Sequence, residues 1–420
     1  MLLVERNGYT GKLNFGRGVN GERSIAVSEN CSHDKVSRVG SEMPPFLVMD
    51  VLDRARALER EGRSIIHMEV GEPDFDTPQV IRDAGIRALQ DGHTHYTHSL
   101  GHPELREAIA GWMHRQYDVD VSPERVIITM GSSGAMVLLY QAMLDPGDRV
   151  LMTDPHYACY PNFVRACHAE SVRLPVGEAA GFQYDPDQVA AEVRRGARAL
   201  LLNSPANPTG IVTTPERLQR IAEITRGRVQ IVSDEIYHGL TYREKAHSIL
   251  EYDAEAVVIS GFSKLFAMTG WRLGYAIVPE YLVRPMQKLQ QNLFVSPPDF
   301  PQFAAIAALT EADAEIEFMR QSYDERRKLV LQKLTAMGLN ILVEPTGAFY
   351  VFFNVGRYTT DVHSFAFEIL DQAGVALTPG VDFGPHGEGF LRLSYANSLE
   401  NLQEGLERLA RFLAGKPAIA

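Results

Sequence analysis

Short apolar runs alternate with helical patterns through the middle of the chain. The runs are rich in Val, Ile and Leu, and they occupy residues 125–130, 149–154, 171–176, 198–204, 229–235, 256–260 and 273–278. Segments with helical periodicity, such as residues 132–144 and 215–227, separate several of them. Continuous apolar runs of this length are typical of strands buried on both faces, which the intervening helices can cover. The sequence therefore predicts an α/β fold with a mainly parallel sheet flanked by helices.

A second unit follows this region. From about residue 300 the chain turns helical, with a long charged helix near residues 311–337. A smaller α+β unit is then predicted from a helix over residues 398–413 and from apolar runs at residues 341–343, 348–354, 375–378 and 389–393. The helix predicted over residues 46–61 is expected to join it. We therefore expect three parts: an irregular N-terminal extension (1–42), a large domain (73–299) and a small domain (43–72 and 300–420).

The composition narrows the class of protein. The chain has 420 residues and a net charge of −12, which disfavours general binding to nucleic acid or to an anionic membrane. Three cysteines, at positions 31, 159 and 167, are too few and too uneven for a disulfide framework. No apolar run reaches the length of a membrane span. A cytoplasmic protein is expected.

One lysine stands among small and apolar residues, in the segment SGFSKLFAMTGWRLGY at 260–275. With few polar neighbours, the ammonium group of Lys264 loses hydration, and its neutral, nucleophilic form becomes accessible. This suits Schiff-base chemistry with an aldehyde cofactor. Arg272 follows eight positions later, and its fork of donors suits a phosphate.

A candidate anion site precedes this segment. The stretch ITMGSSGAMVLL at 128–139 is predicted to be a strand, a turn of small residues and the start of a helix. Free N–H groups at a helix start favour an anion, and Gly131, Ser132, Ser133 and Gly134 let it approach the backbone. An ordinary tight turn between a strand and a helix would have the same pattern, so the pairing with Arg272 decides for an anion site.

Two further blocks complete the pattern: NSPANPTG at 203–210 and SDEIYHGL at 233–240. With Asn207, Asp234 and Lys264 in this order, the chain resembles the class I/II aminotransferases, pyridoxal 5′-phosphate (PLP) enzymes of fold type I, near the aspartate-aminotransferase-like subgroup. The resemblance covers about residues 43–412. It implies amino-group transfer between an L-amino acid and a 2-oxo acid through an internal aldimine on Lys264, with ping-pong kinetics.

The resemblance also implies roles for individual residues. Lys264 is the catalytic lysine, and the phosphate is held by Ser132, Ser133, Ser263 and Arg272. Gly261 stands where relatives often have a serine, so one hydroxyl contact is either missing or supplied by Ser260. Asp234 keeps the ring nitrogen protonated, and an uncompensated carboxylate at the end of an apolar strand would otherwise be costly. Asn207 and Tyr237 donate to the phenolic oxygen, and either Tyr157, our first candidate, or Tyr160 stacks on the ring.

The substrate and the partner subunit are expected to use other residues. Arg392 is unusual within an apolar strand pattern, and by resemblance it binds the substrate α-carboxylate, which Gly71 also approaches. In relatives, a tyrosine at the position of Tyr96 reaches the phosphate of the neighbouring subunit, which implies a homodimer with shared active sites. The nearby histidines, at positions 93, 95, 98 and 102, are interpreted as solvated loop residues and not as a metal site.

Two other functions remain open at the level of the sequence. A PLP-dependent C–S β-lyase, or another lyase acting at Cα, would use the same residues to labilise the same proton. A PLP-binding transcription regulator would need a DNA-binding module ahead of this fold, and residues 1–42 are too short and too irregular for one. The identities of the amino donor and of the acceptor are not predicted.

Overall fold

The computed structural model describes residues 36–419, and the chain divides into two compact units, Met1–Met43 and Pro44–Ala420. The described part of the first unit holds one short helix, α1 (Arg38–Glu42), which starts where the Ser37 side chain accepts from the Gly40 N–H. Residues 1–35 of the predicted N-terminal extension, including Cys31, lie outside the described residues. Cys159 and Cys167 are free thiols.

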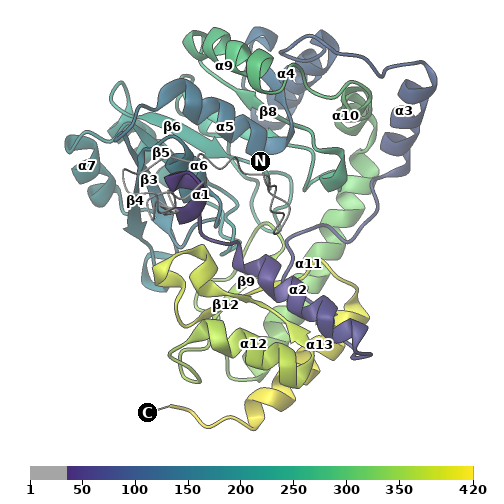
Figure 1. Ribbon diagram of the computed structural model, residues 1–420, viewed down its shortest axis with the longest axis vertical. Helices are drawn as coiled ribbons and strands as arrows, with labels where there is room; N and C mark the ends of the chain where they lie inside the picture. The colour runs from purple at the N-terminus through teal and green to yellow at the C-terminus, as the bar shows by residue number, and fades with distance from the viewer. Residues whose placement is uncertain (1–35, 420) are drawn as a thin grey trace, which may run out of the picture. The chain divides into compact units, whose positions relative to one another are not determined.

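A seven-stranded sheet forms the centre of the second unit (Figure 1). Its spatial order is β2-β8-β7-β6-β5-β3-β4. The strands are β2 (Val126–Thr129), β3 (Arg149–Asp154), β4 (Glu170–Pro175), β5 (Ala199–Asn203), β6 (Gln230–Asp234), β7 (Val257–Gly261) and β8 (Gly274–Ile277). All pairs are parallel except those of β8, which runs antiparallel to both β2 and β7. The prediction of a mainly parallel sheet in an α/β fold is thus confirmed.

The reversed direction of β8 has a local cause. Between β7 and β8 the chain forms only the short turn η4 (Thr269–Trp271), without a crossover α-helix. A parallel connection usually needs such a helix to carry the chain back along the sheet. Lys264 and Arg272 both lie in this connection, so the strand reversal keeps them at one edge of the sheet.

Helices cover both faces of the large sheet, as the apolar runs require. Successive strand residues belong to opposite faces: Leu200 and Leu202 pack into one core cluster, and Leu201 packs into the other. One face is covered by α5 (Gly131–Met143), α6 (Tyr160–Ala166) and α9 (Glu280–Leu293). The other is covered by α4 (Pro103–Tyr117), α7 (Pro186–Arg194), α8 (Pro215–Thr225) and α10 (Phe300–Glu311). Helix α3 (Gln79–Gln90) packs against α10.

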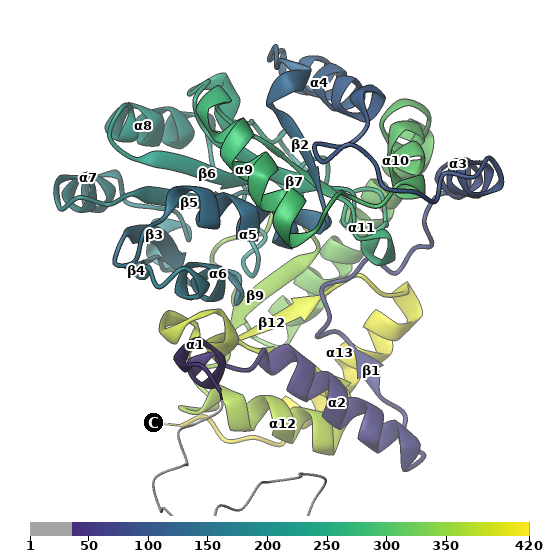
Figure 2. The same ribbon diagram turned by 45° about the horizontal axis from the view of Figure 1, so that its top comes forward.

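Two small sheets form beside it. Strands β9 (Tyr350–Asn354), β11 (Thr378–Pro379) and β12 (Phe390–Ser394) make an antiparallel sheet, and β1 (Ile66–His67) pairs in parallel with β10 (Val375–Ala376). Around them lie α2 (Leu47–Arg60), α12 (Val362–Ala373) and α13 (Leu399–Ala414), as Figure 2 shows. Helix α2 buries Val51, Ala55 and Leu58 against Leu370 and Ala376. The predicted association of the helix at 46–61 with the C-terminal strands is therefore present, while the division into a large and a small domain stays a prediction.

Several predicted elements differ in extent. The long charged helix is α11 (Asp313–Ala336), and Ala312 separates it from α10. The apolar run at 341–343 forms no strand. None of the helices between residues 36 and 419 combines the length and the apolar character that crossing a membrane requires.

Candidate active site

A cleft opens at the carboxyl ends of the parallel strands, where ligands bind in open α/β sheets. Asn203 ends β5, Asp234 ends β6, and Ser263 and Lys264 follow β7. About 310 Å³ of the cleft is accessible to water. Most residues singled out in the sequence line it: Gly71, Ser132, Ser133, Tyr157, Tyr160, Asn207, Asp234, Tyr237, Ser263, Lys264, Arg272 and Arg392.

Lys264 faces the cleft with its amine held in place. Its Nζ donates to the Gly71 carbonyl oxygen at 2.6 Å and lies 6.0 Å from the centre of the Phe349 ring. The surrounding protein withholds water from the ammonium group, and this desolvation lowers the pKa of Lys264 to about 8 against the opposing effect of Glu72. The neutral amine is therefore accessible near neutral pH, as a nucleophile or a general base requires.

Asp234 supplies a buried carboxylate at the base of the cleft. Its Oδ2 accepts from the Tyr160 hydroxyl at 2.8 Å and its Oδ1 accepts from the Ile236 N–H at 3.1 Å. Burial raises the pKa of Asp234 to about 6, although these hydrogen bonds and the charge of Lys264 favour the ionised form. A buried carboxylate of this kind stabilises a cationic partner placed against it.

The two candidate ring-stacking tyrosines differ in what they touch. Tyr157 and Tyr160 meet edge to face, with ring centres 5.3 Å apart, and both line the cleft. Tyr160 is buried, and its hydroxyl donates a hydrogen bond to Asp234. Tyr157 is more accessible and meets the edge of Phe46. Of the two rings, that of Tyr157 is therefore the more available for stacking on a bound cofactor ring.

Arg272 and the start of α5 form the candidate anion site. Gly131 has φ +71°, and a Cβ atom there would lie 2.9 Å from Arg272 Nη2, so the backbone of this turn approaches the guanidinium closely. Ser132, Ser133 and Ser263 line the same cleft as Arg272. Gly134 does not line it; an added Cβ would face Met130 and Thr129 at ordinary contact distance.

The position three residues before Lys264 is glycine for a packing reason. A Cβ atom at Gly261 would lie 2.9 Å from the Gly274 Cα on the neighbouring strand β8. The hydroxyl expected there is not replaced by Ser260. Its Oγ points to the Glu235 carbonyl oxygen at 3.3 Å, and the residue does not line the cleft.

Arg392 enters the cleft from β12, buried among aromatic rings. Its guanidinium lies 4.6 Å from the centre of the Tyr350 ring and 4.8 Å from that of Phe383. Nη1 donates to Asn207 Oδ1 at 3.0 Å, and Nη2 donates to Thr378 Oγ1 at 3.2 Å and to the Glu69 carbonyl oxygen. Within the described residues its Nε has no hydrogen-bond partner, which leaves one donor of a buried cation for a ligand.

Tyr96 lies apart from this set. It is 84% exposed and does not line the cleft. Two of the neighbouring histidines lie beside one carboxylate: His102 Nε2 lies 2.7 Å from Asp299 Oδ1, and His93 Nδ1 lies 3.9 Å from Asp299 Oδ2. Across residues 36–419 no group of three or more His, Cys, Asp or Glu side chains is placed to hold a metal ion.

Other residues of the cleft were not singled out in the sequence. Phe46, Val48 and Met49 come from the start of α2, and Tyr350 comes from β9. The Tyr350 hydroxyl lies 2.7 Å from that of Tyr237. In the sequence these side chains look like ordinary core residues, and only their long-range neighbours reveal them.

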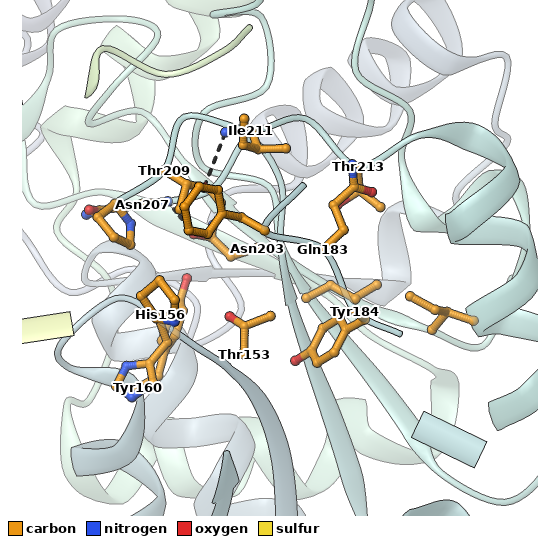
Figure 3. A pocket seen from close by; sticks show the side chains of 16 residues that line it. Thr153, His156, Tyr160, Gln183, Tyr184, Asn203, Asn207, Thr209, Ile211 and Thr213 are labelled. Atoms are coloured by element: carbon orange, nitrogen blue, oxygen red, sulfur yellow. Dashed lines mark hydrogen bonds between the residues drawn. The ribbon is translucent and has the colours of Figure 1, made fainter. Parts of the chain in front are cut away.

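A smaller, enclosed cavity adjoins the cleft (Figure 3). It shares Tyr160, Asn203 and Asn207 with the cleft, and about 30 Å³ of it is accessible to water. Asn203 joins the two sides, since its Oδ1 accepts from the Asn207 N–H at 2.8 Å and its Nδ2 donates to the Asp234 carbonyl oxygen at 3.1 Å. Asn203 thus fixes both residues relative to each other.

The cleft groups fit a phosphorylated pyridine aldehyde. The amine of Lys264 fits an aldehyde carbon, the carboxylate of Asp234 fits a pyridinium nitrogen, and Arg272 with the start of α5 fits a phosphate. The buried donor of Arg392 remains for a substrate anion. Fold and site together define a PLP-dependent enzyme of fold type I.

Comparison with known proteins gives the family. The family model for aminotransferase class I and II matches residues 63–409. A (5-formylfuran-3-yl)methyl phosphate transaminase of Methanocaldococcus jannaschii is 43% identical over 88% of this chain and 96% of its own length. A valine–pyruvate aminotransferase of Mycobacterium tuberculosis is 39% identical over 88% of this chain and 97% of its own length. The structure of Thermus thermophilus aspartate aminotransferase with maleate is 39% identical, with a TM-score of 0.86, over 90% of this chain and 99% of that chain.

The chain belongs to the class I and II aminotransferases. It is a PLP-dependent transaminase that acts on amino-acid and 2-oxo-acid substrates. The predicted family, enzyme class and cofactor are confirmed. The roles of individual residues stay predictions. The position of each residue in the cleft indicates which part of the cofactor or substrate it would contact.

Proposed function

We propose that the amino donor is an L-amino acid with an apolar or aromatic side chain, and that the acceptor is a 2-oxo acid with a single carboxylate. The observation that carries this proposal is the set of cations in the cleft. Among residues 36–419 only Lys264, Arg272 and Arg392 line it with positive charge. The cofactor aldehyde, its phosphate and the substrate α-carboxylate account for all three, so no cation from the same subunit remains for a second substrate carboxylate.

The uncharged wall of the cleft supports the same choice. Phe46, Val48 and Met49 line it from α2, beside Val70. Apolar surface of this kind gains free energy when it covers an apolar side chain, by about 25 cal/mol per Å² buried. Glu72 also lines the cleft, and its carboxylate would repel a second carboxylate on the substrate.

Arg392 and Asn207 orient the donor in this proposal. Arg392 binds the α-carboxylate, and its position is fixed by the rings of Tyr350 and Phe383 and by the Asn207 amide. Asn207 and Tyr237 would hold the phenolic oxygen of the cofactor. The phosphate would be held by Ser132, Ser133, Ser263 and Arg272, and Tyr157 would cover the ring.

Lys264 is the general base and acid of the proposed reaction. Bound PLP supplies an electron sink that makes the proton on the substrate Cα acidic. With PLP bound, the Lys264 amine would take this proton as general base and would later give it back as general acid. Asp234 keeps the pyridine nitrogen protonated, because its buried charge is compensated best by a cation. The same residues act in reverse on the 2-oxo acid, which gives ping-pong kinetics.

The activities for which relatives are named fit this proposal unequally. The M. tuberculosis relative is named for valine and pyruvate, which form a pair without side-chain carboxylates. A Thermus thermophilus relative, 39% identical, is named aspartate/prephenate aminotransferase. That activity involves substrates with a second carboxylate, for which the described residues of one subunit supply no further cation to the cleft.

A panel of donors tests the proposal. Single-turnover rates for leucine, valine, phenylalanine, alanine, aspartate and glutamate are read from the change in the visible spectrum of the bound cofactor. We expect the apolar and aromatic donors to exceed aspartate and glutamate in kcat/KM by at least about tenfold, equivalent to about 1.4 kcal/mol. A preference for aspartate or glutamate would contradict the donor class. Ammonia and pyruvate released from cysteine without an acceptor would instead support the lyase.

A homodimer with shared active sites belongs to the same proposal. Tyr96 is exposed beside Thr97, whose N–H donates to Ser296 Oγ at 3.2 Å, and Val295 next to that contact is also exposed. Exposed apolar groups that gather in this way are typical of an interaction surface. We propose that Tyr96 reaches the phosphate site of a second copy, and that the dimer is cytoplasmic.

Subunit complementation tests the sharing directly. Tyr96→Ala and Lys264→Ala are each expected to be impaired alone, and mixing the two should restore activity. One of the two sites in the mixed dimer would contain both an intact lysine and an intact tyrosine. No recovery on mixing, with dimers present in sedimentation, would contradict the role of Tyr96.

A further inference from the structure

We propose that Asp382 is a positioning residue for the donor side chain, because its carboxylate fixes the end of α2 that forms the apolar wall of the cleft. Asp382 lies on the short helix η5 (Gly380–Phe383), far from α2 in the sequence. The inference rests on the proposed function, in which this wall contacts the side chain of an apolar donor.

Helix α2 has no cap of its own. The N-cap residue, Phe46, makes no side-chain hydrogen bond to the first turn. Instead the Leu47 N–H donates to Asp382 Oδ1 at 2.9 Å, and the Val48 N–H donates to Asp382 Oδ2 at 3.3 Å. A carboxylate is well suited to this place, since it accepts from free N–H groups and complements the positive end of the helix.

The capped turn is the one that lines the cleft. Phe46, Val48 and Met49 belong to it or precede it directly, and all three face the cleft. The Phe46 ring also meets the edge of Tyr157, with ring centres 6.1 Å apart. Without Asp382 the turn would lose two hydrogen bonds at its free end, while the helix would remain anchored by Val51, Ala55 and Leu58. The expected effect is therefore a looser wall and not a lost helix.

The residue after Asp382 ties the same segment to the α-carboxylate site. The Phe383 ring lies 4.8 Å from the Arg392 guanidinium, and the Phe383 carbonyl oxygen accepts from the His156 N–H at 2.8 Å. His156 precedes Tyr157. The segment Asp382–Phe383 thus contacts three parts of the cleft: the apolar wall on α2, the guanidinium of Arg392, and the loop that carries Tyr157. It fixes their positions relative to one another. A change confined to the Asp382 carboxylate should loosen only the first of these.

The test compares a long and a short donor. Asp382→Ala and Asp382→Asn are measured with leucine and with alanine, using the visible spectrum of the bound cofactor in the holoenzyme. Asp50→Asn is the matched control, because Asp50 is exposed in the same turn of α2. We expect Asp382→Ala to raise KM for leucine by about tenfold, of the order that loss of a helix cap costs, and to leave kcat and the alanine kinetics within about threefold.

The milder variant and a second readout keep the test decisive if Asp382→Ala does not fold. Asp382→Asn keeps the shape and loses the charge, so a smaller effect in the same direction is expected. Hydrogen exchange of the peptide containing Leu47 and Val48 should accelerate in both variants and stay unchanged in Asp50→Asn. Unchanged exchange, or an equal loss for leucine and alanine, would overturn the inference.

The two proposals fail in different ways. If the wild-type enzyme prefers aspartate, the proposed donor class is wrong, and the exchange experiment still decides whether Asp382 anchors the turn. If the wild-type enzyme prefers leucine and the Asp382 variants keep the full leucine-to-alanine ratio, the donor class stands and the role of Asp382 is wrong.

Discussion

Arg392 and Asn207 share a hydrogen bond of 3.0 Å from guanidinium Nη1 to amide Oδ1, although they come from β12 and from the loop after β5. Both side chains are buried. The predicted ligand of the substrate carboxylate is therefore held by a predicted ligand of the cofactor. A neutral amide orients the guanidinium without cancelling its charge, so the cation stays available for a substrate anion.

Replacing that amide with a carboxylate should spoil the arrangement. Asn207→Asp is expected to raise KM for amino donors by at least about tenfold, because an ionised partner at 3.0 Å competes with the substrate for Arg392. The dependence of the cofactor's spectral change on donor concentration measures this. Asn354→Asp, at the exposed end of β9, controls for added charge. An unchanged KM in Asn207→Asp would show that Arg392 does not bind the α-carboxylate.

Loss of the lysine should stop turnover. Lys264→Ala is expected to lower kcat by about 10²–10⁴-fold or more, since both proton transfers depend on its amine. The visible absorbance of the bound cofactor should change as well. Lys245→Ala is the matched control, because that lysine lies over the Tyr117 ring and away from the cleft. Full activity of Lys264→Ala would refute the assignment.

The pKa of Lys264 predicts how the apoprotein captures its cofactor. With a pKa of about 8, the neutral amine increases tenfold per pH unit up to that value and then levels off. An unperturbed lysine would continue to gain neutral amine up to about pH 10.4. The capture rate is read from the visible band after mixing with PLP between pH 6.5 and 9.5. The rate at which PLP reacts with the ε-amine of Nα-acetyl-lysine, measured over the same pH range, corrects for the ionisation of PLP itself. A rate still rising steeply above pH 9 would contradict the lowered pKa.

Asp234 predicts a pH-dependent stability of the apoprotein. Its pKa is raised to about 6 in the folded state and is about 3.9 unfolded, so between these values the folded state binds more protons. Its contribution therefore becomes less favourable as pH rises from about 4 to about 6, by at most about 3 kcal/mol. Asp234→Asn should remove this loss. Urea unfolding of both apoproteins at pH 4.5 and 7 measures it, with Asp50→Asn as the exposed control. Parallel changes in all three proteins would contradict the prediction.

The strand pattern and the polar blocks could be predicted because they depend on local sequence. Buried strands read as apolar runs, and Asn207, Asp234 and Lys264 each follow or end such a run, so the topology brings them to one edge. The sequence does not predict the antiparallel direction of β8. That direction follows from the absence of a crossover α-helix between β7 and β8. Ser260 was weighed as a phosphate contact, but its hydroxyl points to the Glu235 carbonyl oxygen.

The apolar wall and its anchor were beyond sequence reasoning for a physical reason. The period of α2 predicts one buried face, and it does not show that the first turn faces a ligand. Asp382 reaches that turn across more than three hundred residues, and nothing local to either segment signals the contact. Tyr350 likewise reads as a core aromatic of β9 until its hydroxyl is seen beside that of Tyr237.

Gly131 and Gly134 both lie in the first turn of α5, and comparing their alanine variants tests whether this turn binds the cofactor phosphate. Gly131→Ala is expected to lower stability by about 1–2 kcal/mol, the cost of a left-handed conformation with a Cβ. It should also weaken PLP binding by about tenfold, because that Cβ would lie 2.9 Å from Arg272 Nη2 and displace the guanidinium.

Gly134→Ala, three residues along the same helix, places its Cβ at 3.5 Å from Met130 Cβ, which is an ordinary contact. Because alanine favours a helix over glycine by about 0.5–1 kcal/mol, this variant should be as stable as wild type or more so, with unchanged cofactor affinity. Urea unfolding and PLP titration of the apoproteins measure both effects. Equal loss of PLP affinity in the two variants would mean that the phosphate approaches the backbone at Gly134 as closely as at Gly131, and that Arg272 alone does not set the affinity.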